Sequence, residues 1–507
     1  MRTVLSVDTY GERDPVTQAD KLIIKVLRSP VQVADSGRSL DFNFGTAHLP
    51  NYGTASAVKA RGQHLRDSLN QHPAIAEVLK FLDGTQLPDV KPIYVVLNQS
   101  SAELIEWETL WGGNEGSFVA LDSRWPVGRM ADPSSSLYRP PGRFELPIRV
   151  MLVISAYAIA DQLREWTAFV GNLASARKLG LPLEVQVKVG DADLRDRIQS
   201  QIDADGLREV NVSMLDTTPA RLAKATEDFN PHVLHFFCHG RSDISAQSLE
   251  LAHGGDYADP DATRGSLNLM RKNLEQLATR LTNPWLLVIN SCNGGKAAGS
   301  LNSLAHSATS AGFPSAVAML EPVDAEDAYE FTSAFYGALF TLFSKAKADI
   351  NAHGEAVIEW GAAMAEARIA IRDLHGNGTE DTNREWSLPA LYVRGIEPFV
   401  LRAPAGPVPA PHLGLGAELG PAAPAAGAPA AGPIAKDPGP VAAPAPSADV
   451  LKDEERTYLL KSRIVAEWLT SAGGVQTREE QAAVIQNVLA DVPAEYWPVL
   501  DEAPANG

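Results

Sequence analysis

The stretches PHVLHFFCHG (231–240) and PWLLVINSCNGG (284–295) decide the fold of this chain. Each begins at a proline, continues through an apolar run, and breaks at glycine. A continuous apolar run bounded by turn residues is typical of a parallel strand buried on both faces. In open α/β sheets, functional groups gather just beyond the carboxyl ends of such strands. Because His239 ends one run and Cys292 ends the other, the sequence predicts a site at this edge.

The surrounding sequence alternates between buried strands and amphipathic helices. Alternation at this pitch predicts an α/β fold with a doubly wound, mostly parallel sheet and helices on both faces. We expect a single charged helix across about 55–83 and a polar loop from Arg241 to about Ser266. The other expected strands of this part are RVMLVISA (149–156), LEVQVKVG (183–190), PSAVAMLEPV (314–323) and EWSLPALYV (385–393).

Changes in composition divide the chain into four segments. Residues 1–146 form an N-terminal α/β part, and residues 147–402 form the expected catalytic domain. Residues 403–448 hold 12 of the 35 prolines among Ala and Gly, which indicates a disordered linker without a packed core. Residues 449–507 regain helical periodicity, with apolar residues four apart, and predict a small helical interaction module.

The composition limits the classes of function. The net charge of −18 argues against binding nucleic acid through a general basic surface. With only two cysteines, a disulfide framework is excluded and a reducing compartment is expected. The N-terminus lacks the apolar stretch of a signal peptide, and no run of about 18 apolar residues appears. We therefore expect a soluble cytoplasmic protein that does not act at a membrane.

The two strand ends carry the groups that a cysteine protease needs. Such an enzyme uses a thiolate, a base for the thiol proton, and hydrogen-bond donors for the oxyanion. A neighbouring imidazolium lowers the pKa of a thiol and generates the nucleophile at neutral pH. We assign Cys292 as nucleophile and His239 as general acid and base. The backbone amides of Gly240 and Cys292 are the expected oxyanion donors.

At these residues the sequence resembles the CHAT domains, caspase-like bacterial proteases of clan CD. His239 and Cys292 are 53 residues apart, close to the spacing of about 50 residues in caspases. The resemblance covers roughly residues 20–400 and is strongest between 231 and 330. It rests on the segments HVLHFFCHGRSD, LLVINSCNGG, SLAHSATSAGFPSAVAMLEPVDAEDA and EWSLPALYV, with IEWETLW (105–111) and WPVGRM (125–130) upstream.

The resemblance implies peptide-bond cleavage without a metal or cofactor. It also implies a regulated effector in bacterial defence or programmed cell death, switched on by a partner. We expect a protein substrate, and an activating or sensor protein bound through residues 449–507. Two alternatives stay open: a catalytically idle caspase-like scaffold that recruits partners through its helical module, and a Cys–His acyltransferase or amidase acting on small molecules.

Other cysteine, histidine and acidic residues near the two strands can be explained without a catalytic role. Cys238 is expected in the core, because it points to the face opposite His239. The same alternation separates His235 from His232 and Cys238, so these residues do not converge on a zinc ion. Two carboxylates, Glu321 and Asp324, lie at the carboxyl end of the strand expected after Cys292. CHAT domains tend to have Trp at the position of Glu321. We expect these carboxylates to be a solvated helix start or to line a pocket that selects Lys or Arg.

Overall fold

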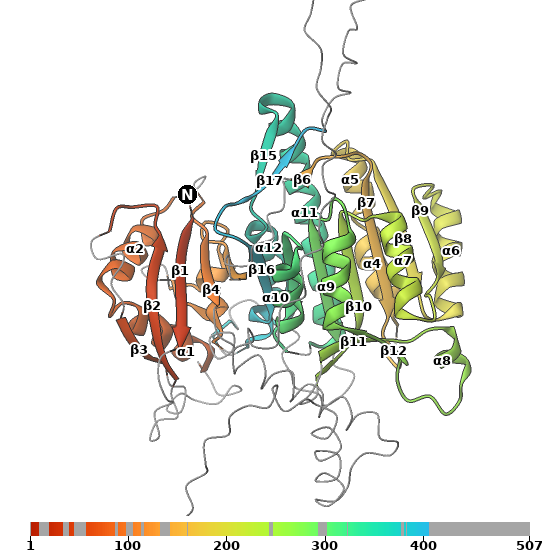
Figure 1. Ribbon diagram of the computed structural model, residues 1–507, viewed down its shortest axis with the longest axis horizontal. Coiled ribbons are helices and arrows are strands. Elements are labelled where there is room, and N and C mark those ends of the chain that lie inside the picture. The colour runs from red at the N-terminus through yellow and green to blue at the C-terminus, as the bar shows by residue number, and fades with distance from the viewer. Residues whose placement is uncertain are drawn as a thin grey trace, which may run out of the picture. The chain divides into compact units, whose positions relative to one another are not determined.

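The computed structural model describes residues 2–9, 20–33, 40–44, 57–86, 90–97, 105–112, 116–131, 142–159, 161–242, 247–292, 302–321, 323–376, 380–381 and 383–404. Within these residues, fourteen strands form one sheet. Twelve of them follow a single path from β3 to β9 (Figure 1). In order along the path they are β3 (Leu40–Phe44), β2 (Asp20–Arg28), β1 (Thr3–Thr9), β4 (Ile93–Leu97), β5 (Val127–Ala131), β16 (Pro389–Arg394), β14 (Ser315–Met319), β13 (Leu286–Cys292), β10 (Val233–Ser242), β7 (Ile148–Ser155), β8 (Leu183–Val189) and β9 (Val210–Met214).

Most neighbouring strands of this sheet are parallel. From β14 through β13, β10, β7 and β8 to β9, each strand runs parallel to the next. Strands β1, β4, β5 and β16 form a second parallel run. Only the β16–β14 pair and the β1–β2–β3 edge are antiparallel along the path. The mostly parallel sheet expected from the apolar runs is confirmed.

The helices form two layers, one on each face of the sheet. The chain winds from β7 to β9 and then reverses, returning through β10 and β13 to β14. Because parallel crossovers are right-handed, this reversal puts the two sets of helices on opposite faces. One layer contains α4 (Leu163–Val170), α5 (Leu173–Lys178), α6 (Ala192–Asp205), α11 (Ala325–His353) and α12 (Gly361–Leu374); the other contains α7 (Pro219–Phe229), α9 (Arg271–Arg280) and α10 (Asn302–Ala311).

The N-terminal residues differ from the sequence expectation in two places. Residues 3–9, for which no strand is expected from the sequence, form β1 in the middle of the N-terminal strands, with Val4 and Val7 fully buried. The single helix expected across 55–83 is two helices, α1 (Ala57–Leu69) and α2 (Pro73–Asp83). Pro73 starts the second helix, and the His72 side chain caps it by accepting a hydrogen bond from the Ala74 amide.

The polar loop expected from Arg241 to Ser266 is also partly regular. Strand β10 extends to Ser242 and pairs with β11 (Gln247–Leu251), which pairs with β12 (Leu267–Met270). Leu249 and Leu251 alternate with polar residues and are fully buried, a period of two that marks a strand. The short helix α8 (Gly254–Ala258) lies between β11 and β12 in the chain. Figure 1 shows these elements beside the carboxyl end of β10.

A small second sheet and three short helical turns complete the described elements. The sheet pairs β15 (Glu355–Ile358) with β17 (Phe399–Arg402), and β17 with β6 (Gly142–Arg143). The turns are η1 (Trp107–Thr109), η2 (Val119–Leu121) and η3 (Glu385–Ser387). The chain divides into two units, residues 1–410 and 411–507. Apart from 403 and 404, the expected linker (403–448) and helical module (449–507) lie outside the described residues.

Candidate active site

The two residues singled out in the sequence are partners in the sheet. Strands β10 and β13 are parallel neighbours, and their register pairs His239 with Cys292. Cys292 is the last residue of β13. The carboxyl ends of these strands therefore meet at one edge, as the pattern of apolar runs predicts.

The His239 ring is held in one orientation by the backbone. The side chain is 9% exposed, and its Nε2 atom lies 2.6 Å from the carbonyl oxygen of Tyr157, just after β7. A carbonyl only accepts hydrogen bonds, so Nε2 carries the proton and donates it. The other ring nitrogen, Nδ1, is buried and has no hydrogen-bond partner in the described part of the chain. His239 therefore presents an unengaged lone pair on Nδ1, as a general base must.

Tyr157 is itself fixed on both sides. Its hydroxyl donates a 3.0 Å hydrogen bond to the Ala262 carbonyl, and its ring packs against Tyr257 at 5.2 Å between centroids. Gln162 donates a hydrogen bond to the Tyr257 hydroxyl. The segment between β11 and β12, which the sequence presented as a loop, thus supports the carbonyl that orients His239.

The remaining dyad and oxyanion assignments stay predictions. The backbone of Cys292 is described within β13, but its side chain and residues 293–301 lie outside the described part. Gly240 is opposite Leu249 in the antiparallel β10–β11 ladder. Cys238 is fully buried, and burial raises the pKa of its thiol. An inaccessible, protonated thiol makes Cys238 a core residue and not a nucleophile.

A buried polar cluster lies behind the dyad positions, and the sequence analysis did not identify it. It connects β10 and β13 to α4 and α11, and all five of its side chains are fully buried. We call it the Glu165 cluster: Glu165, His235, Asn290, Thr332 and Tyr336. A signal was present, because His235 and Asn290 interrupt otherwise apolar strands, and a polar side chain buried in a strand needs a partner.

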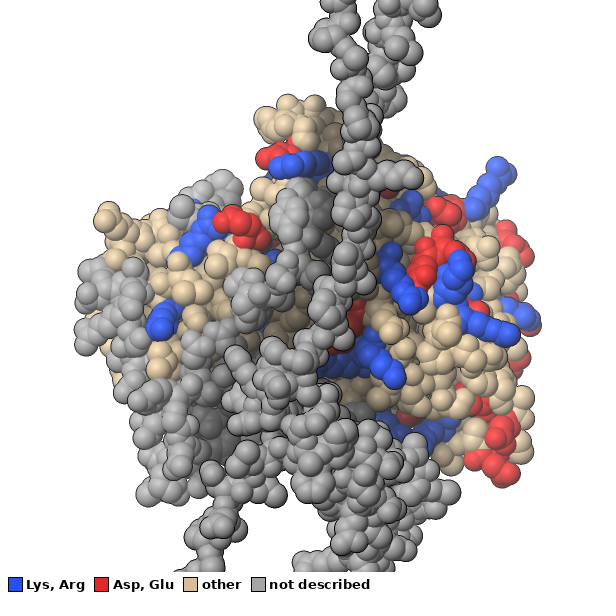
Figure 2. All heavy atoms as spheres, in the orientation of Figure 1, with Lys and Arg blue, Asp and Glu red and all other residues tan. Residues whose placement is uncertain are grey.

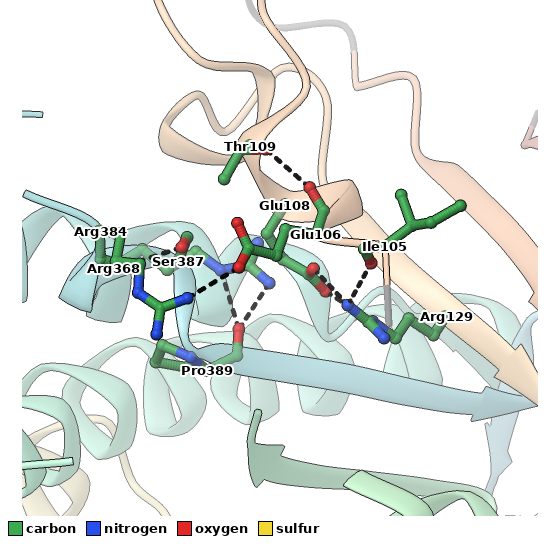
Figure 3. A network of polar contacts seen from close by, with 9 residues as sticks. All are labelled: Ile105, Glu106, Glu108, Thr109, Arg129, Arg368, Arg384, Ser387 and Pro389. Carbon is green, nitrogen blue, oxygen red and sulfur yellow. Dashed lines mark hydrogen bonds and ion pairs between the residues drawn. The ribbon is translucent and has the colours of Figure 1, made fainter. Parts of the chain in front are cut away.

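Glu321 and Asp324 occupy different environments. Glu321, with a side chain 51% exposed, forms an ion pair with Arg384, whose guanidinium also donates a 2.8 Å hydrogen bond to Glu106 (Figure 3). Asp324 is the exposed N-cap residue of α11, and its side chain makes no capping hydrogen bond. Glu321 therefore meets a basic group of the chain itself, so a basic substrate side chain has to compete with Arg384.

Burial raises the pKa of Glu106 to about 7, against the opposing effect of Arg384. Glu321 and Glu108 add to the rise. The charge balance around Arg384 thus changes within the neutral pH range.

The described residues offer no group of three His, Cys, Asp or Glu side chains that could hold a metal ion. On the face shown in Figure 2, the coloured Lys and Arg side chains are interspersed with Asp and Glu. None of the helices in the described ranges is both long enough and apolar enough to cross a membrane.

Comparisons with known proteins identify one sequence family and distant structures. A sequence model of the CHAT domain matches residues 59–357. No curated protein matches the sequence. Among solved structures, the Arg-specific cysteine proteinase gingipain R has 9% identity and a TM-score of 0.35, over 63% of this chain and 68% of its own. The Saccharomyces cerevisiae separase–securin complex has 13% identity and a TM-score of 0.31, over 67% of this chain and 17% of the other.

These structural similarities are too weak to assign an activity or a substrate. The sequence match is of a different kind, because it spans more than half of the chain and contains both β10 and β13. It also contains the candidate residues His239 and Cys292, at the ends of parallel strands in a doubly wound sheet. The chain belongs to the CHAT domain family.

Proposed function

We propose that this protein is a cysteine endopeptidase that cleaves a partner protein with Cys292 as nucleophile and His239 as general acid and base. The observation that carries the proposal is the pairing of the two residues across β10 and β13, with the Nδ1 atom of His239 unengaged by any of the described residues. Family membership supports the reaction class. The role of a regulated effector in bacterial defence or cell death rests on the family resemblance alone.

The reaction requires one proton carrier and one nucleophile. The Cys292 thiol gives its proton to His239 Nδ1, and the thiolate attacks the carbonyl carbon of the scissile peptide. The oxyanion accepts hydrogen bonds from the amides of Gly240 and Cys292. His239 then protonates the leaving amine as the C–N bond breaks, which leaves a thioester. Water, deprotonated by His239, hydrolyses the thioester and releases the acid product and the free thiol.

The Tyr157 carbonyl contributes by fixing the tautomer. While Nε2 donates to this carbonyl, only Nδ1 can accept the thiol proton. The hydrogen bond also stabilises the imidazolium that forms, because the positive ring donates more strongly to the carbonyl. Neither step requires a metal or a cofactor.

Labelling with a thiol-reactive peptide probe tests the dyad directly, because the chain has only two cysteines. We expect the wild-type chain to be labelled at Cys292, and Cys292→Ala and His239→Ala to lose labelling. The matched control is Cys238→Ala, which removes the buried thiol and should keep the label. Equal labelling of wild type and His239→Ala, or no labelling with any peptide in the presence of candidate partners, would favour an idle scaffold.

The substrate and the activator require a second experiment. We propose that residues 449–507 bind a sensor or recruit the substrate, and that Glu321 and Asp324 contribute to the substrate pocket. Co-expression with the proteins encoded beside it should yield a neighbour cut by wild type and not by Cys292→Ala. Deletion of residues 449–507 should abolish this cleavage while probe labelling of Cys292 persists. Unchanged cleavage after the deletion would reject the role of that segment.

A further inference from the structure

The Glu165 cluster joins the two strands of the dyad to one carboxylate. Glu165 lies in the first turn of α4, and its Oε1 atom accepts hydrogen bonds from Thr332 at 2.6 Å and Asn290 at 3.2 Å. His235 Nε2 lies 3.0 Å from the same oxygen, outside hydrogen-bond geometry. One oxygen thus faces β10, β13 and α11 at once.

Asn290 makes the densest set of contacts in the cluster. Its side-chain nitrogen approaches three acceptors, Glu165 Oε1, the Ala328 carbonyl at 2.9 Å and the Thr332 hydroxyl at 3.0 Å. Asn290 is two residues before Cys292, about 7 Å along an extended strand. Strand β13 is therefore attached to α4 and α11 through Asn290, two residues before Cys292.

The β10 side of the cluster is held in the same way. The hydroxyl of Tyr336 lies 3.0 Å from His235 Nδ1, and burial, with a smaller contribution from Glu165, raises the pKa of Tyr336. The hydroxyl therefore keeps its proton, and donating it to Nδ1 leaves the imidazole proton on Nε2, facing Glu165. His235 is four residues before His239 on the same strand.

Stability alone does not explain this arrangement. Asn290 Oδ1 and Glu165 Oε2 are buried without a hydrogen-bond partner among the described residues. A buried polar atom left unpaired costs about 1–3 kcal/mol. An apolar residue at position 290 would continue the run of Leu286 to Ile289 without this cost. A group that is expensive to bury and lies next to a candidate site points to a role in that site.

We propose that Asn290, Thr332 and Glu165 are positioning residues that hold the Cys292 end of β13 against the His239 end of β10. The inference rests on the proposed dyad. A displacement of about 1 Å in a reacting group can slow a reaction by about a hundredfold. Loosening this attachment should therefore reduce the reactivity of the Cys292 thiol more than it reduces the stability of the fold.

The test follows alkylation of Cys292 by iodoacetamide in the full-length chain, with the modified cysteine identified by mass spectrometry. Rates are measured from about pH 5 to about pH 9, which brackets the ionisation of a free thiol near 8.5. The variants are Asn290→Ala and the near-isosteric Thr332→Val, which removes one hydroxyl and keeps the packing volume. Thr332→Ser restores the hydroxyl and serves as the rescue.

The matched control is Asn283→Ala, just before the other end of β13. Asn283 is also buried, and it bridges the backbone of Arg143 and the indole of Trp285. We expect Asn290→Ala and Thr332→Val to slow alkylation at neutral pH by about tenfold and to raise the pH midpoint. Thr332→Ser and Asn283→Ala should keep the wild-type profile, although Asn283→Ala, which also removes buried hydrogen bonds, should lower the melting temperature.

His239→Ala separates failure of this inference from failure of the dyad. If His239→Ala raises the pH midpoint while Asn290→Ala and Thr332→Val leave it unchanged, the dyad stands and the positioning role is overturned. If Thr332→Ser behaves like Thr332→Val, the hydroxyl is not the positioning group and the inference is also overturned. If His239→Ala leaves the profile unchanged, the proposed dyad fails, and this inference fails with it.

Discussion

Two clusters in this fold each contain a fully buried carboxylate, and they pair its two oxygens in different ways. In the first, which we call the Glu108 cluster, Arg129 donates to both carboxylate oxygens of Glu108, at 3.0 and 2.7 Å, and to the Ile105 carbonyl at 3.0 Å (Figure 3). Both side chains are fully buried and both oxygens are paired. In the Glu165 cluster, one carboxylate oxygen accepts hydrogen bonds from both Thr332 and Asn290, and the other has no partner among the described residues.

The difference separates a structural role from a functional one. The Glu108 cluster joins η1 to β5, and beside it Arg368 of α12 donates twice to the Pro389 carbonyl at the start of β16. Because Arg129 donates to both oxygens of Glu108, this bidentate pair fixes the relative position of the two side chains and leaves neither carboxylate oxygen without a hydrogen bond. The Glu165 cluster leaves polar atoms unpaired beside the candidate dyad, where an arrangement that is not optimal for stability can serve chemistry.

The largest effect on stability should come from breaking the Glu108 cluster. We expect Arg129→Met to lower the free energy of unfolding by about 3–5 kcal/mol, because it leaves the buried Glu108 carboxylate without its partner. Urea denaturation of the full-length chain measures the change. The control is the double variant Glu108→Leu/Arg129→Met, which should recover most of the loss. A loss below about 1 kcal/mol for the single variant would remove the contrast between the clusters.

Glu165→Gln should be less damaging to the fold and more damaging to the site. The amide oxygen can still accept from Thr332, and the amide nitrogen can take the place of the unpaired oxygen. We therefore expect a loss of about 1–2 kcal/mol, together with slower alkylation of Cys292. Glu108→Gln is the matched control, with the reverse outcome: a larger loss of stability for a protein that still folds, and an unchanged alkylation rate per folded molecule. The same ranking in both assays would contradict the division of roles.

Glu106, next to the Glu108 cluster, should make stability depend on pH. Burial raises its pKa from 4.5 to about 7, so the folded state binds this proton more tightly than the unfolded state. This contribution to stability is complete below about pH 4.5 and is lost as the pH rises through about 7. Glu106→Gln should reduce the drop in melting temperature between about pH 5 and about pH 8. An identical drop in wild type and variant would show that Glu106 does not titrate in this range.

A smaller effect on stability is expected for Arg384→Ala, which removes the partner of the half-exposed Glu321 and the 2.8 Å hydrogen bond to Glu106. The exposed pair with Glu321 contributes about 0–1 kcal/mol, and Glu106, with a pKa of about 7, can take up a proton when its partner is lost. The variant leaves Glu321 available to a substrate. A peptide panel should show a stronger preference for Lys or Arg before the cleaved bond. Arg280→Ala, which breaks the exposed pair with Glu227, is the control and should leave the preference unchanged. Cleavage by Arg384→Ala only after apolar or acidic residues would exclude Glu321 from the pocket.

The sequence was sufficient to predict the part of the fold that depends on apolar runs. Strands β10 and β13, and the placement of His239 and Cys292 at one edge of the sheet, follow from such runs and from the rules of doubly wound sheets. That the two strands are direct neighbours, with His239 in register with Cys292, is known only from the structure. Strand β1 was missed because Val4 and Val7 lie in a short stretch with polar neighbours. Strands β11 and β12 were missed because alternating strands carry half as many apolar residues as buried parallel ones.

The Glu165 cluster could not be predicted from the sequence, for a different reason. Glu165 lies on an amphipathic helix, where an acidic residue usually faces solvent, and only the packing of α4 against α11 buries it. Thr332 and Tyr336 are one helical turn apart on α11, but which face of that helix meets the sheet depends on tertiary structure. The sequence could have indicated that Asn290 needs a partner, and not which residue provides it.

The position of β16 has a consequence for synthesis of the chain. It is the sixteenth strand in chain order, yet it lies between β5 and β14 in the sheet. Until Pro389–Arg394 emerges from the ribosome, β5 and β14 are two additional open edges, each a template for pairing with another molecule. The long sequence separation between β5 and β16 also makes their closure slow. A nascent or truncated chain that lacks β16 should therefore depend on a chaperone to escape aggregation, even though both candidate catalytic residues have already been made.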